Sequence, residues 1–188
     1  FIHWGVYAVP AGIHNGKKID GIGEWIQEHA NIPIKDYEKY ARQFNPTDYN
    51  PKEWAKIMKK AGMKYVVITS KHHDGFALWD SAISDYDAVD FAAIGKDLLK
   101  GLAEACKEQG IKFGLYHSIM DWHHPQAQAN DAPRYNSREA PNPDFPKYYE
   151  NYLKPQLKEL VDNYDPDILW FDGEWINVYK HEMGQDLY

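Results

Sequence analysis

Four short apolar runs separated by amphipathic helical patterns constrain the fold of this chain more than any other feature. The runs are rich in β-branched and aromatic residues and lie at residues 1–2, 65–69, 111–116 and 168–171. Strand signals that alternate with helix signals predict parallel βα units. The sequence therefore predicts an α/β fold in which about four strands fall within the 188 residues.

The segments between the apolar runs carry the periodicity of amphipathic helices. Apolar residues recur there at spacings of three and four, which place them on one helical face. The four faces are Tyr37, Tyr40, Ala41 and Phe44; Trp54, Ile57, Met58 and Ala61; Leu98, Leu102, Ala105 and Cys106; and Leu153, Leu157, Leu160 and Tyr164. We expect four helices at these positions.

Capping residues indicate where these helices begin and end. Asn50 is a suitable N-cap for the second helix, with Glu53 as its partner in a capping box and Gly62 as its stop. Gly110 closes the third helix. Pro155 either kinks the fourth helix or sets its true start, because proline lacks the backbone N–H that a helix interior needs.

Two long connections interrupt this pattern, at residues 10–34 and 120–146. Loops of this length in a compact domain usually carry function or are disordered. The length suits one domain, residues 1–188, with a sizeable core. The single cysteine, Cys106, cannot form an internal disulfide, and we expect it to act as a small core residue.

The charge and aromatic content exclude some functions and favour another. A net charge of -7 argues against nucleic acid or an anionic membrane surface as the main partner. No apolar run approaches the roughly 20 residues that a membrane helix needs. Seven Trp and fourteen Tyr residues lie mostly beside His, Asp and Glu. Flat rings next to hydrogen-bonding groups suit sugar recognition.

Each predicted strand ends on titratable or aromatic hydrogen-bonding groups. His3-Trp4 follows the first run, KHHDGF follows the second, YHS ends the third, and DGEW ends the fourth. The opposite ends of the runs carry only turn residues. Active sites of parallel α/β proteins collect at the carboxyl ends of the strands. We therefore expect a functional site at that edge.

Three kinds of chemistry compete for such a site. His72 and His73 resemble a metal cluster, but adjacent histidines on a strand should point to opposite faces, and no His-Glu-x-x-His spacing occurs. A metal-dependent hydrolase stays open as an alternative. Ser70 and Ser118 lack the Gly-x-Ser-x-Gly elbow of a serine hydrolase. Glycoside hydrolysis fits better, since Asp172 follows a strand between Trp170 and Trp175.

Three long motifs resemble the family 29 glycoside hydrolases, the α-L-fucosidases. These motifs are FIHWGVY at residues 1–7, AGMKYVVITSKHHDGFALWDS at residues 61–81, and DILWFDGEW at residues 167–175. GEW at residues 23–25 and YHS at residues 116–118, continuing to DWHHP at residues 121–125, also resemble the family. The resemblance covers nearly the whole chain, and the KHHDGF block is its most specific part.

The resemblance implies a fold, an activity and a site. The fold is a (β/α)8-like, TIM-type barrel, of which this chain would hold the N-terminal half, because a complete barrel takes about 250 residues. The activity is that of a retaining exo-α-L-fucosidase with Asp172 as the nucleophile of a covalent fucosyl-enzyme. The residues expected to bind the fucose are His3, Glu24, Trp25, His72, His73, Tyr116 and Trp170. Neither a metal nor a cofactor is implied.

The sequence departs from the family pattern after the nucleophile. The family places its general acid/base, a Glu, tens of residues downstream, and Glu174 and Glu182 do not match that position. Without the acid, a fucose-binding module without turnover is a second hypothesis. We expect His123 and His124 to lie at the surface or rim. Half of a barrel would expose sheet edges, which favours self-association. By resemblance a bacterial periplasmic or secreted location is expected, and the linkage preference stays open.

Overall fold

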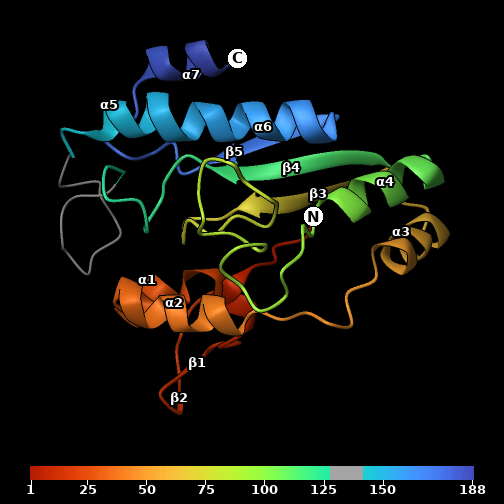
Figure 1. Cartoon of the computed structure of the whole chain (residues 1–188), viewed down its shortest axis with the longest axis horizontal. Coiled ribbons are helices and arrows are strands. Elements are labelled where there is room, and N and C mark those ends of the chain that lie inside the picture. The colour runs from red at the N-terminus through yellow and green to blue at the C-terminus, as the bar shows by residue number, and fades with distance from the viewer. Residues whose placement is uncertain (128–141) are drawn as a thin grey trace.

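A computed structural model describes residues 1–127 and 142–188 of the chain. Its central sheet contains three parallel strands in the order β3-β4-β5, namely Tyr65–Lys71, Lys112–Ser118 and Ile168–Asp172. The carboxyl ends of all three strands point toward the end of the molecule where α1 and α2 lie (Figure 1). The predicted α/β class with a parallel sheet is confirmed.

The predicted first strand is wrong as a strand. Only Ile2 pairs with the sheet, in a single parallel bridge to Ile68. The Ile2 N–H donates to the carbonyl oxygen of Val67 at 2.8 Å, but the N–H of Trp4 donates to the side-chain oxygen of Thr69 at 3.1 Å. Because a hydroxyl replaces the backbone carbonyl there, the ladder ends after one residue.

The four predicted helices are confirmed. They are α2 (Ile34–Gln43), α3 (Pro51–Lys60), α4 (Lys100–Gln109) and α6 (Lys154–Tyr164). Helices α3 and α4 pack on each other at the amino end of the sheet, opposite to α1 and α2 (Figure 1). Among the described residues, none of the helices is long and apolar enough to cross a membrane.

The predicted caps are made, with one difference. The side chain of Asn50 accepts a hydrogen bond from the N–H of Glu53 at 3.2 Å. The carboxylate of Glu53, however, pairs with Lys56 at 2.7 Å, so it does not complete a capping box. Gly62 and Gly110 both adopt a positive φ, at +79° and +62°; Gly110 directly follows α4, and Gly62 follows α3 after one residue, Ala61.

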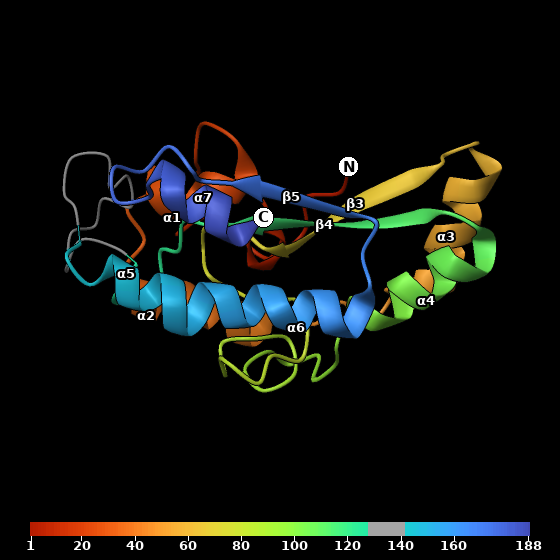
Figure 2. The same cartoon turned by 90° about the horizontal axis from the view of Figure 1, so that it is seen from above.

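Helix α6 begins at Lys154, so Pro155 lies in its first turn and marks its start rather than a kink in its interior. The helical run before it consists of α5 (Phe145–Tyr148) and a π-helical turn, η3 (Tyr149–Leu153). A wider π turn before the proline accommodates the missing N–H. Seen from above, α5 and α6 lie along one face of the sheet (Figure 2). The last helix, α7 (His181–Leu187), packs on η3, where the hydroxyl of Tyr149 donates to the carbonyl oxygen of Met183 at 2.7 Å.

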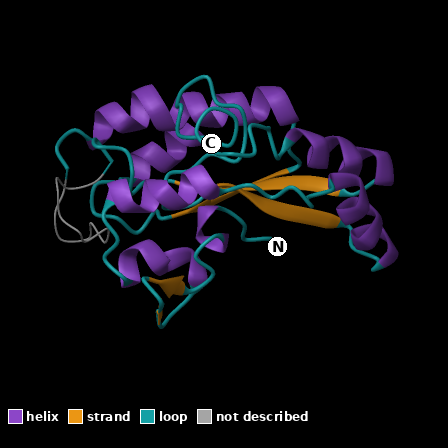
Figure 3. Ribbon diagram, turned by 60° about the horizontal axis from the view of Figure 1, so that its bottom comes forward, coloured by secondary structure: helices purple, strands orange, loops and turns teal. Residues whose placement is uncertain are grey.

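The two predicted long loops differ from each other. Residues 10–34 contain the short hairpin β1 (Ile13–His14) and β2 (Lys17–Lys18), then η2 (Gly23–Trp25) and α1 (Ile26–His29). This hairpin lies apart from the main sheet (Figure 3), and the short helix η1 (Val6–Ala8) precedes it. These elements are too short to show a periodic pattern. Most of the second predicted loop, residues 128–141, lies outside the described residues.

The connection from β3 to α4 has neither helix nor strand, yet much of it is buried. Phe76, Leu78 and Trp79 belong to the core cluster between the sheet and the helices. The carboxylate of Asp87 satisfies backbone donors that have no partner in a helix or strand. It accepts hydrogen bonds from the N–H groups of Val89 at 2.9 Å and Asp90 at 2.7 Å. Cys106 is also buried in this cluster, as expected.

Candidate active site

Asp172 is the last residue of β5 and lies beside Ser118, the last residue of β4. The N–H of Ile119 donates to the backbone carbonyl of Asp172 at 2.8 Å, which extends the pairing past the strand. The chain then turns at Gly173, where φ is +79°. A Cβ at Gly173 would lie 2.8 Å from the Cβ of Met120, so this close approach requires glycine. The two strand ends are thereby held together.

Two donors hold the carboxylate of Asp172. The hydroxyl of Tyr116 donates to Oδ2 at 2.6 Å, and the N–H of Gly173 donates to Oδ1 at 2.8 Å. Burial, together with the neighbouring carboxylate, raises the pKa of Tyr116, so the phenol stays protonated as a donor. The side chain of Asp172 is 28% exposed. It is therefore an oriented carboxylate with an open side.

His72 and His73 lie together next to this carboxylate. Their ring centroids are 4.2 Å apart, and Nε2 of His73 lies 3.9 Å from Oδ2 of Asp172. The expectation that they point to opposite faces was wrong, because β3 ends at Lys71 and the chain turns between His72 and Gly75. The alternation of a strand no longer applies to residues in a turn.

Both imidazoles are buried and electrically neutral at pH 7. Burial, with His73 and His3 as smaller causes, lowers the pKa of His72 well below its usual value. Burial lowers the pKa of His73 to about 4 despite the opposing effect of Asp172. Nδ1 of His72 is buried without a hydrogen-bond partner among the described residues. Neutral imidazoles can donate and accept hydrogen bonds, which suits hydroxyl groups.

Aromatic rings surround the two histidines. The ring of Tyr116 stacks on His72 at 5.3 Å, and His3 meets the same two rings edge-on. Trp25 and Trp175 stand edge-on to His73 at 5.2 and 5.7 Å. The structure thus brings together Asp172 and five of the seven residues that the resemblance assigns to fucose binding.

The other two predicted residues lie at the margin of this cluster. Trp170 is 53% exposed and meets Phe1 edge-on at 5.3 Å, and Phe1 in turn stacks on His3. Glu24 is half-buried in η2. Burial raises the pKa of Tyr7, whose ring contacts His72, and the carboxylates of Asp74 and Glu24 add to this shift.

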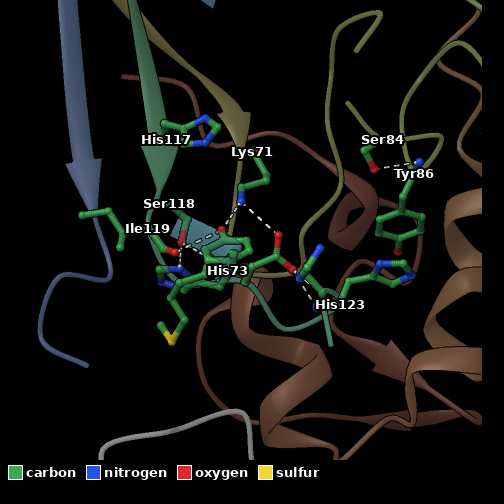
Figure 4. A network of polar contacts seen from close by, with 12 residues as sticks. Lys71, His73, Ser84, Tyr86, His117, Ser118, Ile119 and His123 are labelled. Carbon is green, nitrogen blue, oxygen red and sulfur yellow. Dashed lines mark hydrogen bonds and ion pairs between the residues drawn. The ribbon is translucent and has the colours of Figure 1, made fainter. Parts of the chain in front are cut away.

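A buried ion pair beneath the site was not predicted. Nζ of Lys71 lies 2.9 Å from Oδ2 of Asp121 and donates to the hydroxyl of Tyr148 at 2.8 Å (Figure 4). Burial opposes the ionisation of Asp121, but Lys71 and the nearby imidazoles lower its pKa to about 2. The sequence signal that could have indicated a buried charge is the position of Lys71, which ends an apolar strand and precedes two histidines.

Asp121 also organises the next turn. Its Oδ1 accepts from the N–H groups of His123 at 2.9 Å and His124 at 2.8 Å. Both histidines are half-buried, which fits a position at the rim. The ring of His123 stacks on Tyr86 at 3.7 Å (Figure 4). Its Nε2 lies 3.0 Å from Oε1 of Glu38.

One ligand atom from each of His72, His73 and Asp172 lies within 4.8 Å of the others, a spacing that a metal ion can use. The donors fit a transition metal such as zinc. Nδ1 of His73 contacts Ser118 at 2.6 Å, which leaves Nε2 as its ligand atom. The spacing of these three ligand atoms is therefore compatible with the alternative of a metal-dependent hydrolase.

An oriented carboxylate and neutral imidazoles inside an aromatic wall, at the carboxyl edge of a parallel sheet, are typical of a glycoside hydrolase with a TIM-type barrel. The chain belongs to the alpha-L-fucosidase family, whose model matches residues 1–186. The alpha-L-fucosidase of Dictyostelium discoideum is 33% identical over 96% of this chain. That match covers 41% of the Dictyostelium protein, so the chain spans less than half the length of this relative.

Solved structures agree with this assignment. A family 29 (GH29) alpha-L-fucosidase of Bacteroides thetaiotaomicron matches with a TM-score of 0.85 and 36% identity, covering 98% of this chain and 42% of that one. The Lactobacillus casei alpha-L-fucosidase in complex with its alpha-L-fucose product matches with a TM-score of 0.82 and 35% identity, covering 99% and 61%. The structural neighbours have TIM-barrel catalytic domains.

Proposed function

We propose that these residues form part of the catalytic barrel of a retaining exo-α-L-fucosidase, as a single domain that corresponds to the N-terminal half of the barrel. Asp172 is its nucleophile. The observation that carries this proposal is the carboxylate of Asp172, held by the Tyr116 hydroxyl at 2.6 Å and open on one side. The complex of the Lactobacillus casei relative with fucose supports the choice of sugar.

The residues around Asp172 bind the fucose ring. His72 and His73 bond its hydroxyls, and the pairing of two imidazole rings 4.2 Å apart beside Asp172 supports this role. His3 and Tyr116 line the same side. Trp25, Trp170 and Glu24 complete the wall, where an apolar indole surface favours the methyl group of fucose over a hydroxymethyl group.

The reaction proceeds in two displacements. A carboxylate oxygen of Asp172 attacks the anomeric carbon, the bond from that carbon to the leaving oxygen breaks, and the leaving oxygen takes a proton. Water then hydrolyses the fucosyl ester. The hydrogen bonds from Tyr116 and Gly173 keep the attacking carboxylate oriented.

The proton donor is a carboxylic acid outside these 188 residues. Glu174 is exposed and follows the turn at Gly173. It serves neither as nucleophile nor as acid. The chain alone is then nearly inert on natural fucosides, whose leaving oxygen needs a proton, and reacts only with activated ones.

Labelling with 2-fluoro-fucosyl fluoride tests the nucleophile, because fluoride leaves with little help from an acid. Intact-mass spectrometry and peptide mapping should find one fluoro-fucosyl group on Asp172. Asp172→Asn should abolish the label, whereas the matched control Glu174→Gln should keep it. A label that survives Asp172→Asn, or that maps to Glu174, would exclude the assignment.

The same experiment separates two alternatives. A fucose-binding module without turnover would bind L-fucose but take up no label. A metal-dependent hydrolase using His72 and His73 is favoured by the 4.8 Å grouping of their ligand atoms with Asp172. Protein dialysed against a chelator would then lose reactivity, which zinc would restore. Full labelling of metal-free protein would exclude the metal reaction.

The sheet edges give the proposal a further consequence. Among the described residues, β5 pairs only with β4, and Trp170 and Tyr65 are exposed at 53% and 58%. Open edges and exposed aromatic rings favour association of the 188-residue chain with itself. Sedimentation velocity over a concentration series should show oligomers, and a strictly monomeric chain would contradict this expectation.

A further inference from the structure

Ser118 lies between a site histidine and a backbone carbonyl. It is fully buried at the end of β4. Its Oγ is 2.6 Å from Nδ1 of His73 and 2.5 Å from the carbonyl oxygen of Met120 (Figure 4). The close packing of Gly173 on Met120 keeps this turn in place. The chain thus positions one hydroxyl against two groups at once.

The chemistry of these three groups determines where the protons lie. A carbonyl oxygen only accepts hydrogen bonds, so the single hydroxyl proton of Ser118 is donated to Met120. Oγ must then accept from Nδ1 of His73, and Nδ1 carries the ring proton. Because the imidazole is neutral, Nε2 carries none.

Nε2 is the ring nitrogen that faces the site. It lies 3.9 Å from Oδ2 of Asp172, which is too far for a hydrogen bond between them. We propose that Ser118 is a positioning residue that fixes the tautomer of His73, so that Nε2 presents a lone pair beside the nucleophile. His73 therefore accepts a hydrogen bond from one sugar hydroxyl and donates none to Asp172.

The molecule contains a second pair of the same kind. Nδ1 of His117 is 2.9 Å from Oγ of Ser70, and Ser70 donates to the backbone carbonyl of Tyr116 at 2.7 Å. Both residues are buried, and Nε2 of His117 has no hydrogen-bond partner among the described residues. His73 differs from His117 in that its Nε2 lies 3.9 Å from a carboxylate oxygen of Asp172. Ser70 thus offers a matched control for Ser118.

The consequence for the sugar rests on the proposed function. A bare Nε2 requires a hydroxyl that donates. Fluorine accepts weakly and never donates, so a fluorine at the position facing His73 would meet a lone pair. We expect fluorine there to weaken binding at least as much as hydrogen does, by roughly tenfold relative to the hydroxyl.

Nitrogen-15 NMR of the histidine rings of the 188-residue chain at pH 7 tests the tautomer without any ligand. His73 should carry its proton on Nδ1. Ser118→Ala should move it toward Nε2 and leave His117 unchanged, Ser70→Ala should do the converse, and Ser118→Thr should restore the original pattern. A proton on Nε2 of His73 in the unsubstituted chain overturns the proposal, and so does a Ser118→Ala spectrum without change. Should Ser118→Ala not fold, the unsubstituted spectrum alone decides.

Titration with L-fucose and its monodeoxy and monofluoro analogues tests the role in binding. One position should show the fluorine penalty, and Ser118→Ala should reduce that penalty relative to the deoxy analogue. Equal binding of every fluoro analogue and L-fucose would overturn the role of Ser118 in recognition. Failure to bind L-fucose at all would instead contradict the proposed function, while the NMR result would still decide the tautomer.

Discussion

The three strands of the sheet end at its carboxyl edge and begin at its amino edge, and these two edges place charged groups differently. At the carboxyl edge Lys71 and Asp121 form an ion pair with no exposed side-chain surface. At the amino edge Lys112 pairs with Asp167, and the lysine side chain is 68% exposed. Gly110 and Asp165, both with positive φ, form turns at the amino edge.

The exposed charges of the amino edge are compatible with a stable fold, whereas the buried charges of the carboxyl edge indicate a functional requirement. Burying a charged or polar group is unfavourable unless it is fully paired, and apolar packing would stabilise the same volume as well. The amino edge avoids that penalty by leaving its charges in water. The carboxyl edge accepts it for Lys71, Asp121 and two neutral histidines, as expected where a site requires those groups.

Removing one partner of each ion pair should give the largest contrast. Lys71→Met leaves Asp121 buried and uncompensated, so the free energy of unfolding should fall by about 3–5 kcal/mol. Urea denaturation at pH 7 measures this loss. Lys112→Met at the exposed pair is the matched control and should lose only a small fraction of that amount. Equal losses at the two sites would contradict the contrast between the edges.

The buried histidines should make the carboxyl edge sensitive to acid. The pKa of His73 is lowered to about 4 from an ordinary value of 6.5, so its stabilising contribution is present above pH 6.5 and is lost as the pH falls toward 4. The full difference corresponds to about 3 kcal/mol, of which roughly 2 kcal/mol falls between pH 7 and 5. His73→Gln should flatten the decline in stability over that interval by this amount.

Asp74 supplies a control of opposite sign. Burial raises its pKa to about 6, so its ionised form destabilises the fold above that pH and the penalty disappears as the pH falls. Asp74→Asn should therefore make the decline in stability between pH 7 and 5 steeper, by about 1 kcal/mol. Denaturation curves at several pH values measure both slopes. Two variants that change the slope in the same direction would exclude this account.

The sequence allowed the regular parts of the fold to be predicted, because their signals are local. The amphipathic faces and the caps at Asn50, Gly62 and Gly110 all depend on residues within one or two helical turns. The strand at residues 1–2 failed since a distant hydroxyl, that of Thr69, takes the N–H of Trp4. The π turn before Pro155 has no periodic signal of its own.

The candidate site shows the same division. Its position at the strand ends followed from topology, and Asp172, His72 and Tyr116 do lie together. The shared side of His72 and His73 was missed, because strand alternation does not extend into a turn. Lys71 with Asp121 was missed as well, since fifty residues separate the partners and only packing joins them.

Replacing a glycine by alanine should give the smallest difference in stability loss between the two edges. Gly173 and Gly110 both have positive φ, so alanine at either site costs about 1 kcal/mol or more in backbone strain. At Gly110 the nearest atom to an added Cβ is the flexible end of Lys59 at 3.9 Å, but at Gly173 it would lie 2.8 Å from Met120 Cβ and 2.9 Å from its backbone nitrogen.

Gly173→Ala should therefore lose at least about 1 kcal/mol more than Gly110→Ala, because the turn that holds Ser118 must move. Thermal or urea unfolding of the two variants measures the difference. The displaced turn should also slow labelling of Asp172 in Gly173→Ala but not in Gly110→Ala. Equal losses with equal labelling would mean that the turn yields freely, and that the carboxyl edge is held by its buried ion pair rather than by the close contact between the turns that follow β4 and β5.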